Sequence, residues 1–346
     1  MATLRTAPRV RSDAVPLRTF RSSGRPVAIA GLGAYAPERI YTNFDLEKLM
    51  DTSDQWIRER TGIVRRHVAE PGTATFELAT QAARRALANA SLKASDLDLI
   101  IVATSTPDGP FPSIACRVQN ELGAPGAGAF DLLAACSGFV YGLSCAETYI
   151  AGQRAENVLV VGAEVLTRMV DWNHRTTAVV FGDGAGAAVL RPARSGAGFL
   201  SWCLGADGRG YEQVTAGNVA HGAYASLESA PIIDMKGPDV FRFAVDILIR
   251  QAYACAAEAG IAIDEIDHWI PHQANRRIIE AAADRIGLPM DKVVCNIDEY
   301  GNTSTASIPI ALEEAAWAGR IKPGDKVLMA GFGSGLTWSA GLMEWE

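Results

Sequence analysis

Three side chains that lie far apart in the sequence could together carry out acyl-transfer chemistry: Cys136, His272 and Asn302. A cysteine thiolate is a strong nucleophile that can hold an acyl group covalently between two reaction steps. A neutral histidine and an asparagine amide can each donate a hydrogen bond to an oxygen on which negative charge develops. The three residues would therefore supply one nucleophile and two neutral donors, provided that the fold brings them together.

Cys136 is the candidate nucleophile because of its place in the chain. Small residues flank it within residues 131–140, and an apolar helix is expected to follow through Ile150. At a helix N-terminus the unpaired N–H groups and the helix dipole favour the thiolate and lower the pKa of the thiol. The alternative is a small buried core residue, which is the interpretation we favour for the cysteines at positions 116, 145, 203, 255 and 295.

His272 and Asn302 lie at positions where an α/β protein forms its sites. His272 comes just after an expected strand at residues 268–270, and Asn302 follows Gly301 in a turn before an expected helix. Sites in open α/β sheets form at the carboxyl ends of the strands. The alternatives are a hydrogen-bonded polar residue at a strand end for His272 and a helix cap for Asn302.

The composition is that of a globular protein of about two domain equivalents. The 346 residues are 49% hydrophobic, and 32 basic against 39 acidic residues give a net charge of −7, which argues against nucleic acid as the main partner. No run reaches the roughly 18 apolar residues of a membrane span. No two cysteines have CxxC spacing, so we expect no disulfide framework, no metal site and a reducing compartment.

Residues 1–25 differ from the rest, with six arginines and one acidic residue. We expect a disordered tail on a cytoplasmic bacterial protein, and an organelle transit peptide, which would place the protein in a plastid, is the weaker alternative. From residue 26 onward, apolar runs such as residues 97–103 predict buried strands, and residues 75–90 predict an Ala-rich helix. The alternation of the two predicts the α/β class.

An internal repeat divides the body into two related halves, residues 26–190 and 195–346. The same offset of 169 separates three pairs of identical residues (259 − 90, 267 − 98 and 270 − 101): Ala90 and Ala259, Asp98 and Asp267, Ile101 and Ile270. Cys136 belongs to the first half, and His272 and Asn302 to the second. Pseudo-symmetry would bring their loops together from opposite sides, with Asn302 near the place that corresponds to Cys136 (302 − 136 = 166).

The glycine-rich segments suggest a competing function, a nicotinamide-dependent oxidoreductase. Gly31 and Gly33 follow an expected strand and imitate a dinucleotide-binding turn, but Pro37 prevents the helix which that turn requires. Residues 181–190 lack the Lys-Ser/Thr pair of a phosphate-binding loop and predict a close backbone approach instead. Residues 331–338 predict a turn whose N–H groups could face a reacting carbonyl.

Several ordered motifs together resemble one family. Residues 51–57 (DTSDQWI), 60–63 (RTGI), 135–138 (ACSG), 181–186 (FGDGAG), 271–275 (PHQAN) and 301–304 (GNTS) are similar to those of the β-ketoacyl-[acyl-carrier-protein] synthase III family. The resemblance runs from about residue 26 to the end. It implies a thiolase-like fold of two duplicated α/β halves in an αβαβα layering. It also implies a homodimer that starts type II fatty acid synthesis, condensing a short acyl-CoA with malonyl-acyl carrier protein without a cofactor or metal.

The resemblance also implies roles for the reacting groups. Cys136 would carry the acyl group, and His272 and Asn302 would bind the thioester oxygen of the malonyl group. The backbone N–H groups of Cys136 and Ser334 would form a second oxyanion hole, and Phe111 would line the acyl pocket across the dimer interface. Ser334 and Thr305 depart from the usual Gly and Ala of the family.

Binding roles follow from the same resemblance. Coenzyme A contacts are expected from Thr52, Trp56, Arg60, Arg175 and Asn275. Carrier-protein contacts are expected from Gln273, Ala274, Asn275, Arg276, Arg277 and Arg242. A basic patch would steer an acidic carrier protein, whereas the alternatives are a solvated helix face for the arginines and a core position for Trp56. A specialised ketosynthase, for a secondary metabolite or a long-chain ketone, remains an alternative function, and the presence of all three reactive residues disfavours a silent partner subunit.

Overall fold

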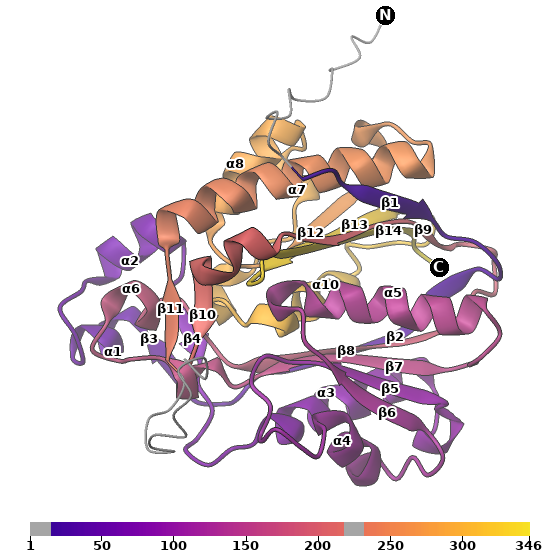
Figure 1. Cartoon of the computed structure of the whole chain (residues 1–346), viewed down its shortest axis with the longest axis horizontal. Helices are drawn as coiled ribbons and strands as arrows, with labels where there is room; N and C mark the ends of the chain where they lie inside the picture. The colour runs from indigo at the N-terminus through magenta and orange to yellow at the C-terminus, as the bar shows by residue number, and fades with distance from the viewer. Residues whose placement is uncertain (1–14, 218–231) are drawn as a thin grey trace, which may run out of the picture.

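The computed structural model describes residues 15–217 and 232–346, which form five alternating layers of helix and sheet (Figure 1). Two five-stranded sheets enclose a central layer of helices, and further helices cover the outer face of each sheet (Figure 1). This is the layered α/β architecture that the sequence predicted.

Four neighbouring strands of one sheet have counterparts in the same order in the other sheet. The first runs β2 (Val27–Tyr35), β8 (Gly184–Pro192), β7 (Val158–Glu164), β5 (Leu99–Ala103) and β6 (Gly128–Leu132). The second runs β1 (Arg18–Arg21), β9 (Gly198–Ala206), β14 (Thr337–Glu344), β13 (Lys326–Gly333) and β12 (His268–Pro271). Strand β5 is parallel to β7, as β12 is to β13, while β8 and β14 are antiparallel to both of their neighbours.

The helices are arranged as related pairs in the two halves. The central layer holds α5 (Gly138–Ala151) and α10 (Ser307–Trp317) (Figure 1). The outer layers hold α3 (Thr75–Ala90) and α4 (Ile114–Leu122) on one side, and α7 (Gly237–Ala259) and α8 (Arg276–Ile286) on the other. Smaller elements at one end of the molecule are α1 (Asn43–Glu47), α2 (Asp54–Thr61), α6 (Arg175–Ala178), α9 (Ile297–Tyr300), β3 (Ile40–Thr42), β4 (Arg65–His67), β10 (Val214–Ala216) and β11 (Ile233–Met235).

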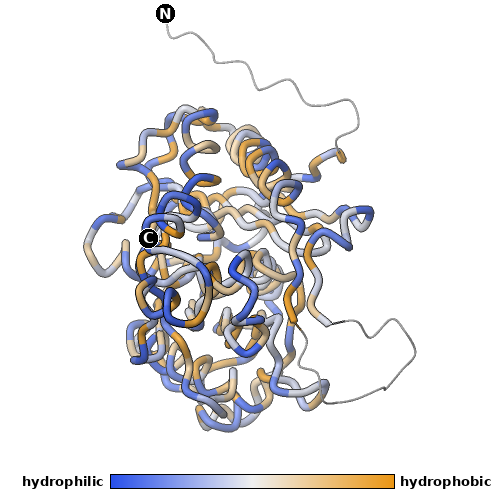
Figure 2. The backbone as a smooth tube through the Cα atoms, turned by 90° about the vertical axis from the view of Figure 1, so that its left-hand side faces the viewer, coloured by the Kyte–Doolittle hydropathy of each residue, from blue (hydrophilic) through white to orange (hydrophobic). Residues whose placement is uncertain are grey.

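The sequence patterns explain these layers. Strands β5 and β7 are buried along their whole length, as expected when helices cover both faces of a sheet. The outer helices are amphipathic, so hydrophilic and hydrophobic stretches alternate along them (Figure 2). Within the described residues, no helix combines the length and the apolar character that crossing a membrane requires.

Gly31 and Gly33 serve packing between β2 and α3. A Cβ at Gly31 would lie 2.5 Å from the carbonyl oxygen of Ala86, and one at Gly33 would lie 2.4 Å from that of Ala82. Both glycines lie inside a strand that continues to Tyr35, with no helix opening behind them. The interpretation of this segment as a dinucleotide-binding turn is therefore wrong.

The repeat extends to details of the backbone. A 3₁₀ turn at Ala135–Ser137 leads into α5, and one at Ser304–Ala306 leads into α10, 169 residues later (304 − 135). Ala135 and Ser304 have positive φ angles of 46° and 48°. The structural counterpart of Cys136 is therefore Thr305 (305 − 136 = 169), and the expected correspondence with Asn302 is wrong by three residues.

The start of the folded body also differs from the expectation. Strand β1, at Arg18–Arg21, pairs antiparallel with β9, so the expected disordered tail does not extend to residue 25. The first 14 residues of that predicted tail lie outside the described residues. Strand β1 adds a fifth strand to the second sheet, and its pairing explains why a basic, weakly apolar segment is ordered.

Candidate active site

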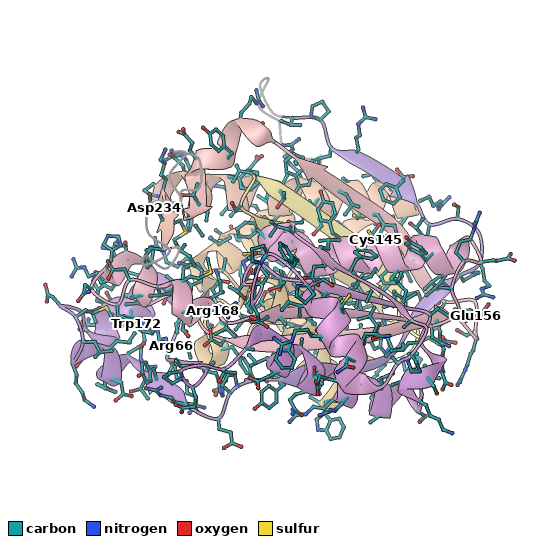
Figure 3. The ribbon with its side chains drawn as sticks, turned by 60° about the horizontal axis from the view of Figure 1, so that its bottom comes forward. Arg66, Cys145, Glu156, Arg168, Trp172 and Asp234 are labelled. Carbon is teal, nitrogen blue, oxygen red and sulfur yellow. The ribbon has the colours of Figure 1, made fainter. Side chains whose placement is uncertain are left out.

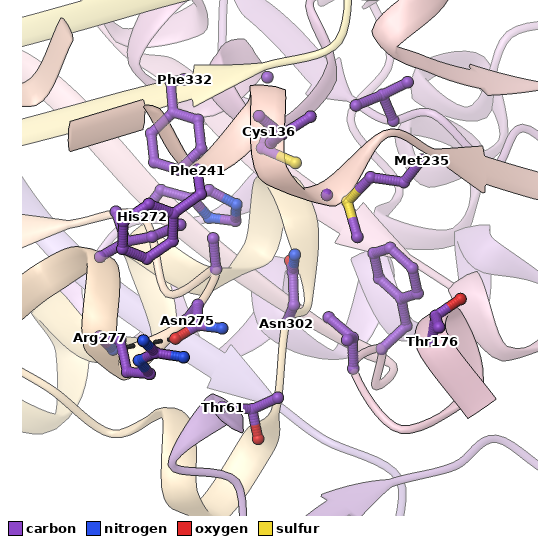
Figure 4. A pocket seen from close by; sticks show the side chains of 18 of the residues that line it. Thr61, Cys136, Thr176, Met235, Phe241, His272, Asn275, Arg277, Asn302 and Phe332 are labelled. Carbon is purple, nitrogen blue, oxygen red and sulfur yellow. Dashed lines mark hydrogen bonds between the residues drawn. The ribbon is translucent and has the colours of Figure 1, made fainter. Parts of the chain in front are cut away.

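A cavity of about 440 Å³ contains the three candidate reactive residues. Cys136, His272 and Asn302 all line it, although they come from different elements (Figure 4). Cys136 precedes α5, His272 follows β12, and Asn302 lies between α9 and α10. The structure thus brings together the residues that the sequence analysis combined by type, and the two halves provide them from opposite sides.

The backbone after β13 closes tightly on Cys136. A Cβ at Gly333 would lie 2.7 Å from the backbone nitrogen of Cys136, and one at Gly331 would lie 3.2 Å from its carbonyl oxygen. Only glycine allows this approach. Ser334 follows directly, and its hydroxyl donates to the carbonyl of Val214 at 2.5 Å, so the serine side chain is occupied elsewhere.

The thiol of Cys136 is less acidic than its helix position suggests. Burial raises the pKa of this thiol to about 12; a hydrogen bond with Ser304 opposes the rise, and the negative charge of Glu164 adds to it. The sequence analysis expected a lowered pKa from the N-terminus of α5. That expectation is wrong because desolvation of the thiolate outweighs the helix end.

His272 is held as a neutral hydrogen-bond donor. Its ring is 1% exposed and packs edge-on against Phe332, and burial lowers the pKa of this histidine to about 3. Ser307 Oγ lies 2.7 Å from Nδ1 and itself accepts from the backbone N–H of Gln273. This hydroxyl has no other acceptor among the described residues, so it donates to Nδ1, which leaves the proton of the neutral ring on Nε2.

Asn302 presents a donor for a comparable reason. Its Oδ1 accepts a hydrogen bond from the backbone N–H of Ser304 at 2.8 Å. This contact assigns the orientation of the amide, because only the oxygen can accept. The Nδ2 group is then free to donate into the cavity, so the site holds two neutral donors, as the sequence analysis expected.

The outer part of the cavity contains an aromatic ring that contacts two cations. The ring belongs to Trp56 of α2. The guanidinium carbon of Arg175 lies 5.0 Å from the centroid of this ring, and that of Arg60 lies 5.8 Å from it. Trp56 and Arg60 line the cavity. Thr52 does not line it, and the hydroxyl of Thr52 is buried without a partner among the described residues.

Asn275 connects this region to α8. Its Oδ1 accepts from the backbone N–H of Arg277 and caps the helix, and its Nδ2 donates to the carbonyl of Arg60 at 2.9 Å. Asn275 also lines the cavity, as does the half-buried Ala274. These two residues thus face the cavity.

The three arginines expected to contact the carrier protein differ in whether a carboxylate neutralises their charge. Arg276 pairs with Glu280 at 2.8 Å, and Arg242 pairs with Asp239. Arg277 is exposed, lies over the ring of Phe241, and forms no ion pair with a carboxylate of the described residues. Arg277 is therefore the arginine of this group whose charge is least compensated.

Two of the expected site residues do not take their expected places within one chain. Gln273 is 1% exposed, and its side chain bonds to the carbonyls of Pro271 and Val294 and to the N–H of Asn296, so its assignment to the carrier surface is wrong. The hydrogen bonds of the Gln273 amide are thus made inside the fold. Phe111 is 85% exposed and lies outside the cavity lining, so within one chain it does not shape an acyl pocket.

The structure adds residues that the motifs did not single out: Glu164, Ser304, Ser307, Phe241 and Phe332. Glu164 did carry a signal, since it is an acidic residue at the end of an apolar strand, where α/β sites form. The role of Ser307 depends on a contact with His272, a residue far from it in the sequence. Among the described residues, no group of three or more His, Cys, Asp or Glu side chains is placed to hold a metal ion.

The layered, duplicated fold and this cavity define a condensing enzyme that transfers acyl groups. Residues 130–208 match the family model for 3-oxoacyl-[acyl-carrier-protein (ACP)] synthase III, and residues 256–345 match the model for its C-terminal part. The β-ketoacyl-[acyl-carrier-protein] synthase III of Desulfitobacterium hafniense (strain DSM 10664 / DCB-2) is 50% identical over 324 residues, covering 92% of this chain and 98% of the relative.

Solved structures agree with that match. 3-Oxoacyl-[acyl-carrier-protein] synthase III from Aquifex aeolicus VF5 has a TM-score of 0.87 at 46% identity and covers 92% of this chain and 100% of its own. The priming β-ketosynthase from the R1128 polyketide biosynthetic pathway has a TM-score of 0.88 at 34% identity, covering 97% and 99%. The chain belongs to the 3-oxoacyl-[acyl-carrier-protein] synthase III family.

Proposed function

We propose that this protein condenses a short acyl-CoA, such as acetyl-CoA, with malonyl-acyl carrier protein and thereby starts type II fatty acid synthesis. The products are 3-oxoacyl-acyl carrier protein, CoA and CO₂. One observation carries the proposal: a half-buried cysteine and two neutral hydrogen-bond donors line one cavity in a member of this family. A bacterial cytoplasmic location belongs to the same proposal.

In the first half-reaction the sulfur of Cys136 attacks the acyl-CoA carbonyl. The carbonyl oxygen gains negative charge, which the backbone N–H groups of Cys136 and Ser334 stabilise as an oxyanion hole. The close approach of Gly333 to the nitrogen of Cys136 supports this pairing of donors. Collapse of the intermediate releases CoA and leaves the acyl group on Cys136.

In the second half-reaction malonyl-acyl carrier protein loses CO₂. The electron pair of the breaking C–C bond forms an enolate, so no base has to remove a proton from carbon. The donors His272 Nε2 and Asn302 Nδ2 stabilise the enolate oxygen, whereas a carboxylate in their place would repel it. The enolate carbon then attacks the acyl group, and Cys136 is released.

The surroundings of the cavity support the substrate assignments. Trp56 would offer a flat face for the CoA adenine, and the neighbouring Arg175 and Arg60 would offer positive charge for its phosphates. Thr52 and Asn275 complete the proposed CoA contacts. Arg277 and the neighbouring Arg276 and Arg242 would attract an acidic carrier protein.

We further propose a homodimer joined along β6. This strand is at the edge of the first sheet, so its outer backbone groups are open to pairing. Phe111 and Leu133, which are 85% and 78% exposed, are large apolar side chains on loops beside this edge. In the dimer they would be buried, and Phe111 would line the acyl pocket of the partner subunit.

Mass spectrometry of the intact protein after mixing with a panel of acyl-CoAs tests the function. We expect one acyl group per chain, located on the peptide that contains Cys136, and none in Cys136→Ala. Product formation with malonyl-acyl carrier protein should not respond to NADPH. Acylation at another cysteine would contradict the assignment.

The second candidate is a priming ketosynthase of a specialised pathway. The R1128 priming β-ketosynthase, which covers 97% of this chain at TM-score 0.88, favours keeping it open. The same acyl-CoA panel separates the two. A marked preference for acetyl-CoA favours fatty acid initiation, and rejection of acetyl-CoA in favour of an unusual starter favours the specialised pathway.

A further inference from the structure

The turn after β13 is joined to the segment before Cys136 by side-chain hydroxyls as well as by packing. Thr337, the first residue of β14, has its hydroxyl oxygen 3.0 Å from the carbonyl oxygen of Ala134 and 3.0 Å from that of Ser334. Ala134 lies two residues before Cys136, and Ser334 is itself one of the proposed oxyanion donors. One hydroxyl is therefore within hydrogen-bonding distance of both backbone segments that provide these donors.

Ser137 forms a small network with Thr337. Its hydroxyl oxygen lies 2.6 Å from that of Thr337 and 2.8 Å from the carbonyl oxygen of Ala134. The two hydroxyls have two protons: the short distance between their oxygens requires one proton between them, which leaves the other for a carbonyl. Ser339 extends the network, because its hydroxyl donates to the carbonyl of Ser137 at 3.0 Å. Ser137 and Ser339 are fully buried, so solvent does not compete for their bonds.

The close approach of the two backbone segments does not by itself fix the positions of the two donors. Gly333 allows the approach because it has no side chain, since a Cβ there would lie 2.7 Å from the nitrogen of Cys136. An oxyanion hole requires each N–H group to lie about 2.7–3.1 Å from the same oxygen. A displacement of about 1 Å can lower a rate about 100-fold. Contacts that hold the two segments at one separation therefore matter for the reaction.

We propose that Thr337, together with Ser137, is a positioning residue that holds the backbone N–H groups of Cys136 and Ser334 at the separation that acyl transfer requires. This inference rests on the proposed function, because it concerns the oxyanion formed when Cys136 attacks an acyl-CoA. Neither Thr337 nor Ser137 lines the cavity, so both act through the backbone and not on the substrate.

Two reactions of the same sulfur separate the positioning of the oxyanion donors from a change in the thiol itself. Acylation by acetyl-CoA places negative charge on the carbonyl oxygen, whereas alkylation by iodoacetamide displaces iodide from a CH₂ group and forms no oxyanion. Both reactions use the Cys136 thiolate. A change in the acidity or exposure of the thiol therefore affects both rates, and the ratio of acylation to alkylation reports on the oxyanion hole.

Thr337→Val, which removes the hydroxyl and keeps the branched side chain, is the main variant. At saturating acetyl-CoA we expect single-turnover acylation to be about tenfold slower than in the wild type, as for the loss of one hydrogen bond, while alkylation stays within about twofold. Thr337→Ser, which restores a hydroxyl, should recover most of the acylation rate. Mass spectrometry of the Cys136 peptide measures both reactions.

Thr148→Val is the matched control. Thr148 lies three residues after Cys145 on α5 (Figure 3), and its hydroxyl donates to the carbonyl of Ser144 at 2.9 Å. The substitution removes a threonine hydroxyl from the helix that follows Cys136 without reaching the turn after β13, so both rates should equal those of the wild type. Ser137→Ala keeps the Thr337 hydroxyl, so it should lower the ratio by a smaller factor, and it serves if Thr337→Val does not fold.

Two results would overturn this inference and leave the proposed function in place. If Thr337→Val slowed acylation and alkylation equally, Thr337 would act on the thiol and not on the oxyanion donors. If Thr337→Val were acylated as fast as the wild type, the hydroxyl would have no part in positioning. Failure of acetyl-CoA and of the other acyl-CoAs to acylate the wild type would instead overturn the proposed function, and this inference with it.

Discussion

The hydroxyl oxygen of Ser307 lies 2.7 Å from Nδ1 of His272, and the backbone N–H of Gln273 donates to the same hydroxyl. Because the described residues offer this hydroxyl no other acceptor, Ser307 donates to Nδ1, and Nε2 carries the proton of the neutral ring. The two residues come from different elements of the second half: Ser307 begins α10, and His272 follows β12. A single hydroxyl thus determines which nitrogen of the histidine carries the proton.

Ser307→Ala should therefore weaken decarboxylation without preventing acylation. The ring of His272 would remain in place against Phe332, but its tautomer would no longer be fixed. We expect a loss of about tenfold in CO₂ release, which corresponds to about 1.4 kcal/mol, the upper end of the net contribution of one hydrogen bond. Release of CO₂ from malonyl-acyl carrier protein measures it, and Ser307→Thr, which keeps a hydroxyl, should recover part of the rate.

Substitutions of the three reactive residues should separate the half-reactions. Cys136→Ala should abolish acylation but still permit slow CO₂ release, because His272 and Asn302 remain to stabilise the enolate. His272→Ala and Asn302→Ala should accumulate acylated Cys136 and lose about 10²–10³ in CO₂ release, as for one oxyanion donor. Acyl-enzyme mass and CO₂ release, measured on the same variants, give the answer. A block of acylation in His272→Ala as severe as in Cys136→Ala would make the histidine the base for the thiol.

Arg277→Glu should weaken the use of malonyl-acyl carrier protein while leaving self-acylation by acyl-CoA nearly intact. Arg277 is exposed and has no carboxylate partner among the described residues, so reversing its charge changes attraction into repulsion. The loss should shrink as salt rises, because exposed charges are screened beyond about 8–10 Å at physiological ionic strength. Initial rates against carrier concentration at two salt levels measure it. Arg154→Glu, on the exposed turn after α5, is the charge-matched control, and an equal loss in both half-reactions would contradict the assignment.

The lowered pKa of His272 predicts how stability depends on pH. The unfolded histidine takes up a proton below about pH 6.5, whereas the folded one stays neutral until about pH 3. The unfolded state therefore binds more protons between these values, and stability falls as the pH is lowered through that range. From pH 8 to pH 5 this group should account for about 2 kcal/mol of lost unfolding free energy. Urea unfolding at both pH values should show a smaller loss in His272→Gln than in the wild type.

The same shift predicts that CO₂ release has no acid limb near pH 6.5. His272 remains a neutral donor down to well below pH 5, so protonation of a free histidine does not limit the reaction. The measurement uses Cys136→Ala, in which acylation is absent, over pH 5 to 8. A fall in CO₂ release with an apparent pKa near 6.5 would show that the ring titrates in the folded protein.

The sequence predicted three residues that the structure brings to one cavity, because their types and their positions at the ends of elements carry the signal. Cys136, His272 and Asn302 each follow a strand or precede a helix, and such places are visible as the end of an apolar run. The acidity of Cys136 was predicted wrongly, because burial depends on the backbone of Gly333, nearly 200 residues away, closing on it. Gln273 was misplaced because the turn between β12 and α8 directs its amide inward, to carbonyls of Pro271 and Val294. The burial of Cys136 and the orientation of the Gln273 amide both depend on residues far away in the chain, so the local sequence does not predict them.

The matching bends at Ala135 and Ser304 have one more consequence. Cys136 follows one bend and Thr305 follows the other, and the two 3₁₀ turns lie in contact, so one backbone shape is used twice at the site. Neither loop alone determines the gap between them. The distance between the two turns depends on how the two sheets pack against α5 and α10, so we expect substitutions at those packing contacts to alter the surroundings of Cys136 from outside the cavity.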